Sequence, residues 1–213
     1  MSLQVTEIFA SIQGESTYAG VPCTFVRLTG CNLDCSWCDA KYAREGGEST
    51  SVEDVLRRVR EIDLEHVEIT GGEPLLQEDV YKLLDALIDE DFTVLLETNG
   101  SMDLKRVTDD VVKVMDIKCP SSGMSDRNRL TNLDLLGPRD EVKFVIANRD
   151  DYTWARDMLR KNRRFEHVRT VHFTPVFGAL IPAELAEWIL DDKLPVRFGF
   201  QLHKFIWGAG TRR

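Results

Sequence analysis

Three of the five cysteines lie close together in the chain, at Cys31, Cys35 and Cys38. Thiolates are soft ligands that bind zinc, copper(I) or iron–sulfur clusters, and three of them are one fewer than a closed tetrahedral site needs. The spacing C-x3-C-x2-C, directly after a short apolar segment, therefore predicts an open metal centre with one coordination position left for another molecule.

Two simpler interpretations of these cysteines remain open. A structural zinc site needs a fourth Cys or His nearby, and the next candidates after Cys38 are His66 and Cys119. Cys35 and Cys38 by themselves form a C-x-x-C pair, the spacing of thiol redox sites. Cys23 and Cys119 each stand alone, which is typical of small buried hydrophobic residues, and we exclude both from the metal centre.

Short apolar segments rich in β-branched residues alternate with amphipathic segments along the 213 residues. This alternation is typical of βα units and a largely parallel sheet, and the length suits one domain spanning residues 1–213. We expect strands at Val5–Phe9, Cys23–Thr29, His66–Thr70, Thr93–Glu97, Val111–Ile117, Glu141–Ala147, Arg169–Thr174 and Val196–Phe200. We expect helices at Val52–Glu61, Gln77–Glu90, Tyr152–Lys161 and Pro182–Asp191.

Groups of glycine, cysteine or polar residues follow four of the expected strands. The cysteines follow the second strand, and Gly71-Gly-Glu-Pro74, Thr98-Asn-Gly100 and Lys118-Cys-Pro-Ser-Ser122 follow the next three. In barrels and open parallel sheets, the carboxyl ends of the strands carry the active site. The sequence therefore predicts an α/β fold, an incomplete (β/α) barrel whose chemistry lies on one rim. The poorly patterned segments 39–49 and 121–138 are the expected mobile covers of that rim.

Charge and hydropathy limit the partners and the compartment. The formal net charge of −9 argues against a nucleic-acid-binding surface, because phosphate binding relies on clustered Lys and Arg. The N-terminus has neither a basic start nor an apolar targeting core, and no apolar segment approaches membrane-spanning length. We expect a cytoplasmic protein with no nucleic-acid or membrane partner, in a compartment where cysteines stay reduced.

The cysteine spacing, followed one βα unit later by Thr70-Gly-Gly-Glu-Pro74, resembles the signature of the radical S-adenosylmethionine (SAM) superfamily. In that superfamily three cysteines hold a 4Fe–4S cluster, and the methionine part of SAM chelates the fourth iron. Cleavage of SAM by the reduced cluster then yields a 5′-deoxyadenosyl radical, so the difficult chemistry belongs to the cofactor. The resemblance implies that SAM contacts Trp37, Asp39, Gly72, Glu73, Thr98, Asn99, Lys118, Ser121 and Ser122.

Some of these residues also have a plainer interpretation. Gly71 and Gly72 suit an ordinary βα turn, and Asn99-Gly100 is a common turn sequence. Ser121 and Ser122 suit a turn cap, and Trp37 is equally suited to shielding the cluster.

A narrower resemblance covers almost the whole chain. Glu7-Ile-Phe-Ala-Ser-Ile-Gln-Gly-Glu-Ser16, Gly20, Arg27 and Gln201-Leu-His-Lys204 are similar to the 7-carboxy-7-deazaguanine synthase family of queuosine and 7-deazapurine biosynthesis. That family converts 6-carboxy-5,6,7,8-tetrahydropterin into 7-carboxy-7-deazaguanine with release of ammonia, and it regenerates SAM. The resemblance implies substrate contacts at Ile12, Gln13, Gly14, Glu15, Arg27, Thr70 and His203.

The residue types suit such a substrate on independent grounds. A pterin presents an amide and guanidine edge that pairs with side-chain amides, carboxylates and backbone groups, and the segment 12–15 offers all of these. Its carboxylate requires a cation, and Arg27 presents a planar fork of donors. The alternatives are a buried ion pair between Glu15 and Arg27, and a packing role for His203.

The family likeness also implies partners. It implies a homodimer and an electron-donor protein such as a flavodoxin. Many members carry Thr or Ser two positions after the last cysteine, where a hydroxyl binds Mg²⁺ beside the substrate carboxylate. This chain has Ala40 there, so magnesium binding would depend on water or backbone oxygens.

Two other classes of protein fit parts of the pattern. A glycyl-radical-enzyme activase shares the cysteine spacing, but it needs a groove for a polypeptide, and Gln13, Glu15 and Arg27 suit a small charged heterocycle better. A zinc- or cluster-stabilised binding protein without turnover would hold metal yet fail to cleave SAM.

Overall fold

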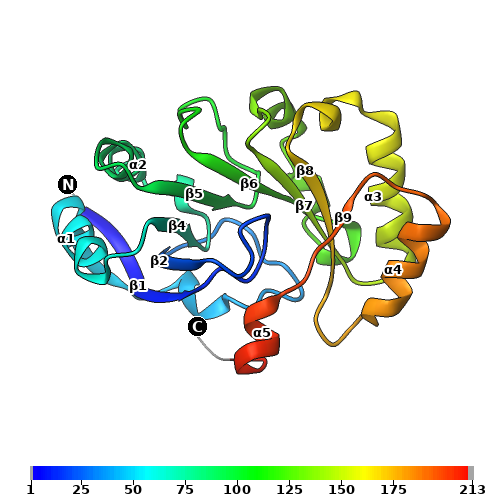
Figure 1. Ribbon diagram of the computed structural model, residues 1–213, viewed down its shortest axis with the longest axis horizontal. Coiled ribbons are helices and arrows are strands. Elements are labelled where there is room, and N and C mark those ends of the chain that lie inside the picture. The colour runs from blue at the N-terminus through cyan, green and yellow to red at the C-terminus, as the bar shows by residue number, and fades with distance from the viewer. Residues whose placement is uncertain (1, 211–213) are drawn as a thin grey trace.

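One curved sheet dominates the computed structural model, which describes residues 2–210 (Figure 1). Within these residues nine strands are arranged in the order β3-β1-β2-β4-β5-β6-β7-β8-β9. Strand β1 pairs antiparallel with β2 and β3, and all pairs from β2 to β9 are parallel. The sheet stays open, which agrees with the predicted incomplete (β/α) barrel.

The strands are β1 Ser2–Ile12, β2 Pro22–Leu28, β3 Glu48–Ser51, β4 His66–Gly71, β5 Thr93–Thr98, β6 Val112–Ile117, β7 Glu141–Ile146, β8 Thr170–Pro175 and β9 Arg197–Phe198. The α-helices are α1 Val52–Ile62, α2 Val80–Asp89, α3 Arg149–Lys161, α4 Pro182–Asp191 and α5 Leu202–Trp207. Short 3₁₀ helices occur at Lys41–Arg44, Pro74–Leu76, Pro120–Ser122, Ser125–Arg127, Leu130–Leu135 and Arg163–His167.

Several predicted elements differ from the structure. Strand β1 extends beyond the predicted Val5–Phe9 at both ends, and β9 covers only two residues of the predicted Val196–Phe200. The predicted helix Gln77–Glu90 begins at Val80, because a 3₁₀ turn precedes it and the Gln77 amide bonds to backbone oxygens of Gln4 and Thr29. The segment 39–49 contains a 3₁₀ helix and the start of β3, which the sequence pattern did not predict.

The two faces of the central strands differ in chemistry, because successive side chains of a strand point to opposite faces. Val67, Ile69 and Leu96 are buried in the hydrophobic core beneath the helices. Helices α1 to α4 cover this outer face (Figure 1). Glu68 and Glu97 occupy the alternate positions, which face the inner side of the sheet. They line a cavity there together with Thr70, Asp116 and Lys143. The fold therefore places charged groups inside the curve of the sheet.

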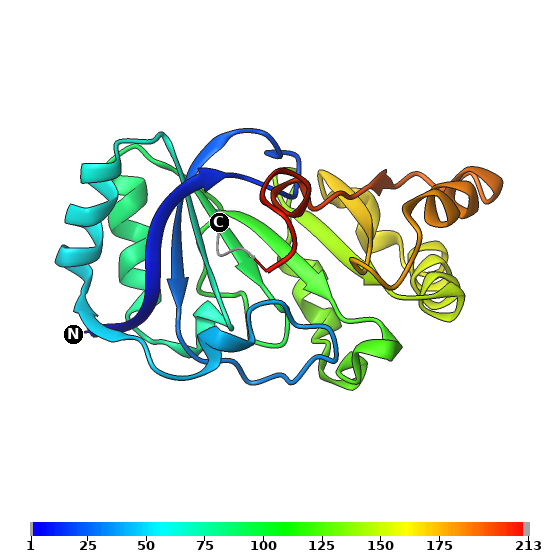
Figure 2. The ribbon, with the colours of Figure 1, turned by 90° about the horizontal axis from the view of Figure 1, so that it is seen from below.

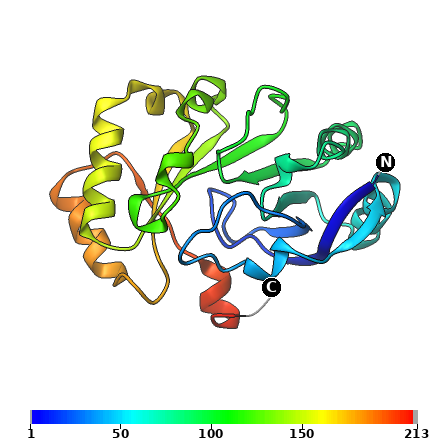
Figure 3. The ribbon, with the colours of Figure 1, turned by 180° about the vertical axis from the view of Figure 1, so that it is seen from behind.

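Helix α5 lies apart from the other helices, at the open side of the sheet (Figures 1 and 2). Seen from behind, it lies close to the loops that follow β1 and β2 (Figure 3). The backbone N–H of Leu202 donates to the carbonyl of Gly14 at 2.9 Å, which ties α5 to the segment after β1. None of the helices within residues 2–210 has the length and apolar character that crossing a membrane requires.

Candidate active site

A cavity of about 510 Å³ opens on the inner side of the sheet. Its wall combines the three clustered cysteines with polar residues from the segment after β1 and from β2, β4, β5, β6 and β7. The predicted site residues that line it are Ile12, Gln13, Gly14, Glu15, Arg27, Cys31, Cys35, Trp37, Cys38, Asp39, Thr70, Gly72, Thr98, Asn99, Lys118 and His203. The structure thus brings all but three of the predicted residues to one cavity.

The cysteine loop is held by its neighbours rather than by its own secondary structure. The backbone N–H of Ser36 donates to the carbonyl of Ser122 at 3.1 Å, and the Arg44 guanidinium donates to the carbonyl of Leu33 at 3.0 Å. All five cysteines are free thiols. Cys23 and Cys119 are buried away from the cavity, as predicted for isolated cysteines.

The donor set fits a 4Fe–4S cluster with SAM. The three thiols face one cavity and influence one another electrostatically, and burial raises the pKa of the Cys35 thiol. In such a cluster each thiolate binds a different iron, so the sulfurs need not converge on one ion. Within residues 2–210, no three His, Cys, Asp or Glu side chains converge on a single-ion site.

A buried acceptor and a cation lie beside the cysteines, as an amino acid ligand would require. Asp116 Oδ1 is buried and, among the described residues, has no hydrogen-bond partner. The Lys118 ammonium pairs with the other carboxylate oxygen of Asp116 at 2.9 Å. Burial opposes the charge of Lys118, but Asp116 outweighs it and raises the lysine pKa. An unsatisfied carboxylate oxygen suits an amino or hydroxyl donor, and the ammonium suits a carboxylate.

Gly72 lies where two loops touch. A Cβ atom on Gly72 would lie 2.1 Å from the carbonyl oxygen of Gly30 and 2.7 Å from Cβ of Cys31. The N–H of the next residue, Glu73, donates to the Gly30 carbonyl at 2.8 Å. The paired glycines therefore let the loop after β4 pack directly against the backbone that leads into the cysteines.

Substituting Gly72→Ala should disturb the cysteine loop. The methyl group would force Gly30 and Cys31 to move, and overpacking of this kind costs about 1–3 kcal/mol. We expect a lower thermal midpoint and less iron per chain after anaerobic reconstitution. Gly137→Ala is the matched control, because its Cβ would meet only Asp140 at 3.9 Å, an ordinary contact. Equal iron content in both variants would contradict this reading of the glycine pair.

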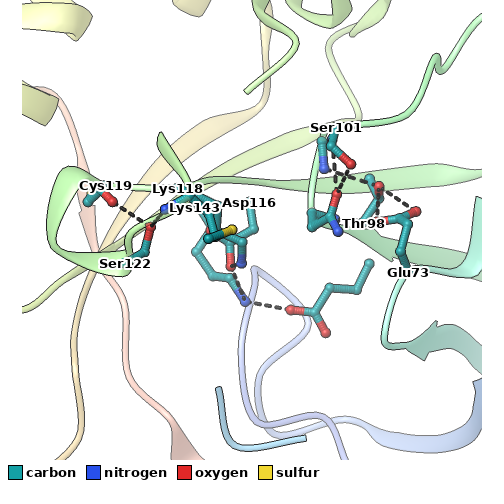
Figure 4. Close-up of polar contacts among 12 residues, drawn as sticks. Glu73, Thr98, Ser101, Asp116, Lys118, Cys119, Ser122 and Lys143 are labelled. Atoms are coloured by element: carbon teal, nitrogen blue, oxygen red, sulfur yellow. Dashed lines mark hydrogen bonds and ion pairs between the residues drawn. The ribbon is translucent and has the colours of Figure 1, made fainter. Parts of the chain in front are cut away.

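Glu73 supports the loops and does not line the cavity. Its carboxylate is completely buried and accepts bonds from the Leu75 N–H at 3.1 Å, the Thr98 hydroxyl at 2.9 Å and the Asn99 N–H at 2.7 Å. Figure 4 shows Glu73 beside Thr98, with Lys118 and Asp116 on the other side of the view. Glu73 thus links the loop after β4 to the loop after β5.

Ser121 and Ser122 also lie outside the cavity lining. The Ser122 hydroxyl donates to the carbonyl of Cys119 at 2.6 Å and accepts from the Met124 N–H at 3.1 Å (Figure 4). This is the turn-capping role that the sequence left as the alternative. The carbonyls of both serines accept bonds from Ser36, so they position the cysteine loop instead of facing a ligand.

Glu15 and Arg27 do not form the ion pair considered as an alternative. Glu15 pairs with the Lys143 ammonium at 2.7 Å, and Arg27 pairs through Nε with Glu7 at 2.8 Å. The Tyr42 hydroxyl donates to the same Glu7 carboxylate at 2.7 Å. Both predicted residues still line the cavity, each held by a different partner.

The segment around α5 closes one side of the cavity. Gln201 donates to Glu15 at 2.8 Å, and the Lys204 ammonium pairs with Asp39 at 2.7 Å. The imidazole of His203 lies directly against Gly14, where an added Cβ would be 2.1 Å from Nδ1. Burial lowers the pKa of His203, which favours the neutral ring. Residues 211–213, at the C-terminal end, lie outside the described part of the chain.

Charged residues that the sequence did not single out also line the cavity. Lys143 contacts Glu15 and Glu97 and lies 3.9 Å from Asp116. Glu68 also lines this region and accepts a bond from the Gln13 amide. A sequence signal for Lys143 and Glu68 existed, since each is a charged residue directly flanked by apolar residues of its strand.

Comparisons with known proteins agree with this site. The model of the radical SAM superfamily matches residues 25–189. The 7-carboxy-7-deazaguanine synthase of Koribacter versatilis is 45% identical and is aligned over 99% of both chains. That of Chlorobaculum tepidum is 46% identical over 99% of this chain and 96% of its own.

A solved structure supports the fold. The crystal structure of QueE from Escherichia coli has a TM-score of 0.74 and 24% identity, and it covers 95% of each chain. At this identity the likeness speaks for the fold alone. From its superfamily match and its full-length relatives, the chain belongs to the radical SAM superfamily and, within it, to the 7-carboxy-7-deazaguanine synthase family.

Proposed function

We propose that this protein converts 6-carboxy-5,6,7,8-tetrahydropterin to 7-carboxy-7-deazaguanine and ammonia, as a radical SAM lyase of 7-deazapurine and queuosine biosynthesis. The observation that carries the proposal is a single cavity that holds both the three cysteines and the polar set Gln13, Glu15 and Arg27. Cysteines alone would suit any superfamily member, whereas the polar set suits a small charged heterocycle.

One group of residues binds the cofactors. Cys31, Cys35 and Cys38 hold the cluster, and the backbone at Gly72 receives the amino group of SAM. The bound 4Fe–4S cluster and SAM supply the radical that removes a hydrogen atom from the substrate.

The remaining residues bind and orient the pterin. Arg27 donates to the substrate carboxylate, while Gln13, Glu15 and His203 hold the ring edge together with backbone groups of Ile12 and Gly14. Thr70 adds a hydroxyl from β4. Helix α5 excludes water and keeps the reacting carbon in place, which supplies much of the rate through orientation.

The proposal includes further partners. The cluster needs a one-electron donor, for which a flavodoxin is suited, and the family likeness supports a homodimer. Free thiols and a reduced cluster fit the cytoplasm. Ala40 lines the cavity and offers no side-chain oxygen, so Mg²⁺ would bind through water or backbone.

Anaerobic incubation of reconstituted protein with SAM, reductant and 6-carboxytetrahydropterin tests the proposal. We expect mass spectrometry to detect 7-carboxy-7-deazaguanine and an equal amount of ammonia. Cleavage of SAM without this product would keep the superfamily assignment and contradict the substrate.

Arg27→Gln should weaken substrate binding more than it slows turnover at saturation. A charge-assisted hydrogen bond is worth about 1.5–3 kcal/mol, so KM for the pterin should rise roughly 10- to 150-fold. Steady-state kinetics measure the change, with Arg106→Gln as control because Arg106 forms an exposed ion pair with Glu78. If Arg27 serves only its ion pair with Glu7, the variant will lose thermal stability while KM stays unchanged.

A further inference from the structure

The proposed reaction requires two proton transfers, and none of the residues assigned to cofactor or pterin binding has been given the role of acid or base. The product equals the substrate minus ammonia, so after ring contraction one C–N bond breaks and its electron pair goes to nitrogen. That nitrogen needs a proton to leave as ammonia. A neighbouring ring carbon loses a proton, and the electron pair of that C–H bond forms the new double bond. The step needs one acid and one base and no oxidant.

The proposed function assigns no role to two carboxyl groups in the cavity, those of Glu68 and Glu97. Glu68 lies on β4 and Glu97 on the adjacent strand β5, and both line the cavity beside the proposed substrate residues. Thr70 connects the two positions, because it lies two residues after Glu68 and its hydroxyl donates to Glu97 at 3.1 Å. Gln13 contacts Glu68 from the other side. The pair therefore faces the same ligand as Gln13 and Thr70.

The surroundings of the two carboxyl groups are opposite in kind. Glu97 receives the Lys143 ammonium and the Thr70 hydroxyl, both of which stabilise an anion. Burial alone would raise its pKa, but Lys143 outweighs burial and lowers the pKa to about 2. Among the described residues, the donor recorded for the Glu68 carboxyl is the neutral Gln13 amide.

Glu68 is therefore the member of the pair in which the protonated form is favoured. It is 4% exposed, and its burial together with the charge of Glu97 raises its pKa well above the ordinary value. Carboxyl pairs whose environments separate their protonation states are typical of acid–base partners. The other charged or titratable groups that surround the pair are Glu15, Cys23, Arg27, Asp39, Asp116, Lys143 and His203.

We propose that Glu68 and Glu97 divide the two proton transfers of ammonia release, a role that rests on the proposed function. The Glu68 carboxylic acid gives its proton to the departing nitrogen, and the Glu97 carboxylate takes the proton from the ring carbon. Passing that proton from Glu97 back to Glu68 restores the starting state. Ammonia leaves neutral, and no other reactant is consumed.

The variants Glu68→Gln and Glu97→Gln separate this late step from hydrogen abstraction. An amide keeps the size of the side chain and one acceptor oxygen but cannot exchange a proton as an acid or base. With substrate deuterated at C6, the carbon from which the proposed reaction takes its hydrogen atom, we expect transfer of deuterium into SAM or 5′-deoxyadenosine at nearly the wild-type rate. Ammonia release should fall about 10²- to 10⁴-fold, the range of general acid–base catalysis. The dissociation constant for the pterin should stay within about threefold, a change of well under 1 kcal/mol.

A measurement without cofactors checks the protonation state separately. At neutral pH, the infrared difference between wild type and Glu68→Gln should contain the carbonyl band of a protonated carboxyl group. Absence of that band would overturn the acid role of Glu68.

The controls distinguish the possible failures. Glu78→Gln alters an exposed carboxylate paired with Arg106 and should leave every readout unchanged. If Glu97→Gln is too unstable to assay, Glu97→Asp replaces it. The shorter side chain keeps a negative charge near Lys143 but moves the carboxylate away from the substrate. Label transfer should therefore continue while ammonia release falls. A parallel loss of label transfer and ammonia release with weaker pterin binding would overturn the proposal in favour of a binding role. A wild-type protein that transfers label but forms no product would instead overturn the proposed function.

Discussion

Replacing Cys35 by alanine should leave a folded protein with no turnover. The thiol of Cys35 lines the cavity with those of Cys31 and Cys38, and a 4Fe–4S cluster that lacks one of its three protein ligands is lost or unstable. We expect iron content after anaerobic reconstitution to fall to a small fraction of the wild-type value. Formation of 5′-deoxyadenosine should fall to background.

Cys119→Ala is the matched control for this loss. Cys119 is 1% exposed and lies outside the cavity lining, and its carbonyl, which accepts the Ser122 bond, remains in the variant. We expect a stability cost of roughly 1 kcal/mol, as for a typical buried substitution, with unchanged iron content. Iron retention in Cys35→Ala together with iron loss in Cys119→Ala would contradict the assignment of the ligands.

Lys143→Met should have the second largest effect. Its ammonium is buried and pairs with Glu15 at 2.7 Å and with Glu97. Removing one partner of a buried ion pair leaves uncompensated charge and costs about 3–5 kcal/mol. We expect a similar loss in the free energy of unfolding. Turnover should also fall sharply, because Glu15 and Glu97 lose the cation that orients them.

The loss in Lys143→Met should depend on pH. In the wild type, the lowered pKa of Glu97 contributes stability that is present above its ordinary pKa and is lost as the pH falls toward about 2. Without Lys143, burial raises the pKa of Glu97. The free-energy cost of burying its ionised carboxylate in the folded protein therefore grows as the pH rises. Denaturant unfolding should therefore show a larger difference from wild type at pH 8 than at pH 5.

Arg57→Met provides the comparison for this ion pair. Arg57 pairs with Asp54 and Glu61 on the exposed face of α1, where solvent screens the charges. Its unfolding midpoint should match the wild type at both pH values. A Lys143→Met variant that behaves like Arg57→Met would show that the buried charges do not depend on Lys143.

The cysteine loop and the rim of the sheet could be predicted from the sequence because the residues that define them lie close together in the chain. The three cysteines lie within eight positions, and each polar motif directly follows its own strand. Parallel strands bring such motifs to one edge whatever the details of packing. The predicted strands in the centre of the sheet accordingly agree with the structure to within one or two residues at each end.

The charged centre of the cavity could not be predicted in this way. Lys143 meets Glu15 across 128 positions of sequence, and only the folded sheet shows that they share a face. Glu68 and Glu97 were visible only as charged residues within apolar strands. Such residues are rarely buried without a partner, so their presence indicated a polar interior without identifying the pairs.

Short elements depend on tertiary contacts in a similar way. Strand β3 is polar, and it exists because its backbone pairs with the edge of β1. Helix α5 has six residues, too few to be stable alone, and the contacts of Gln201, Leu202 and Lys204 hold it in place. Ser121 and Ser122 matched a ligand-binding motif, yet local turn bonds use the Ser122 hydroxyl, Asn148 donates to the Ser121 hydroxyl, and Ser36 donates to both carbonyls.

The ratio of 7-carboxy-7-deazaguanine to 5′-deoxyadenosine is the most direct test of the central claim that this cavity performs ring contraction. Both are measured by mass spectrometry during anaerobic turnover of the reconstituted wild-type protein. We predict many product molecules for each 5′-deoxyadenosine, because the hydrogen atom returns and SAM is regenerated. Accumulation of 5′-deoxyadenosine without the deazaguanine, from protein with a full cluster, would contradict the account.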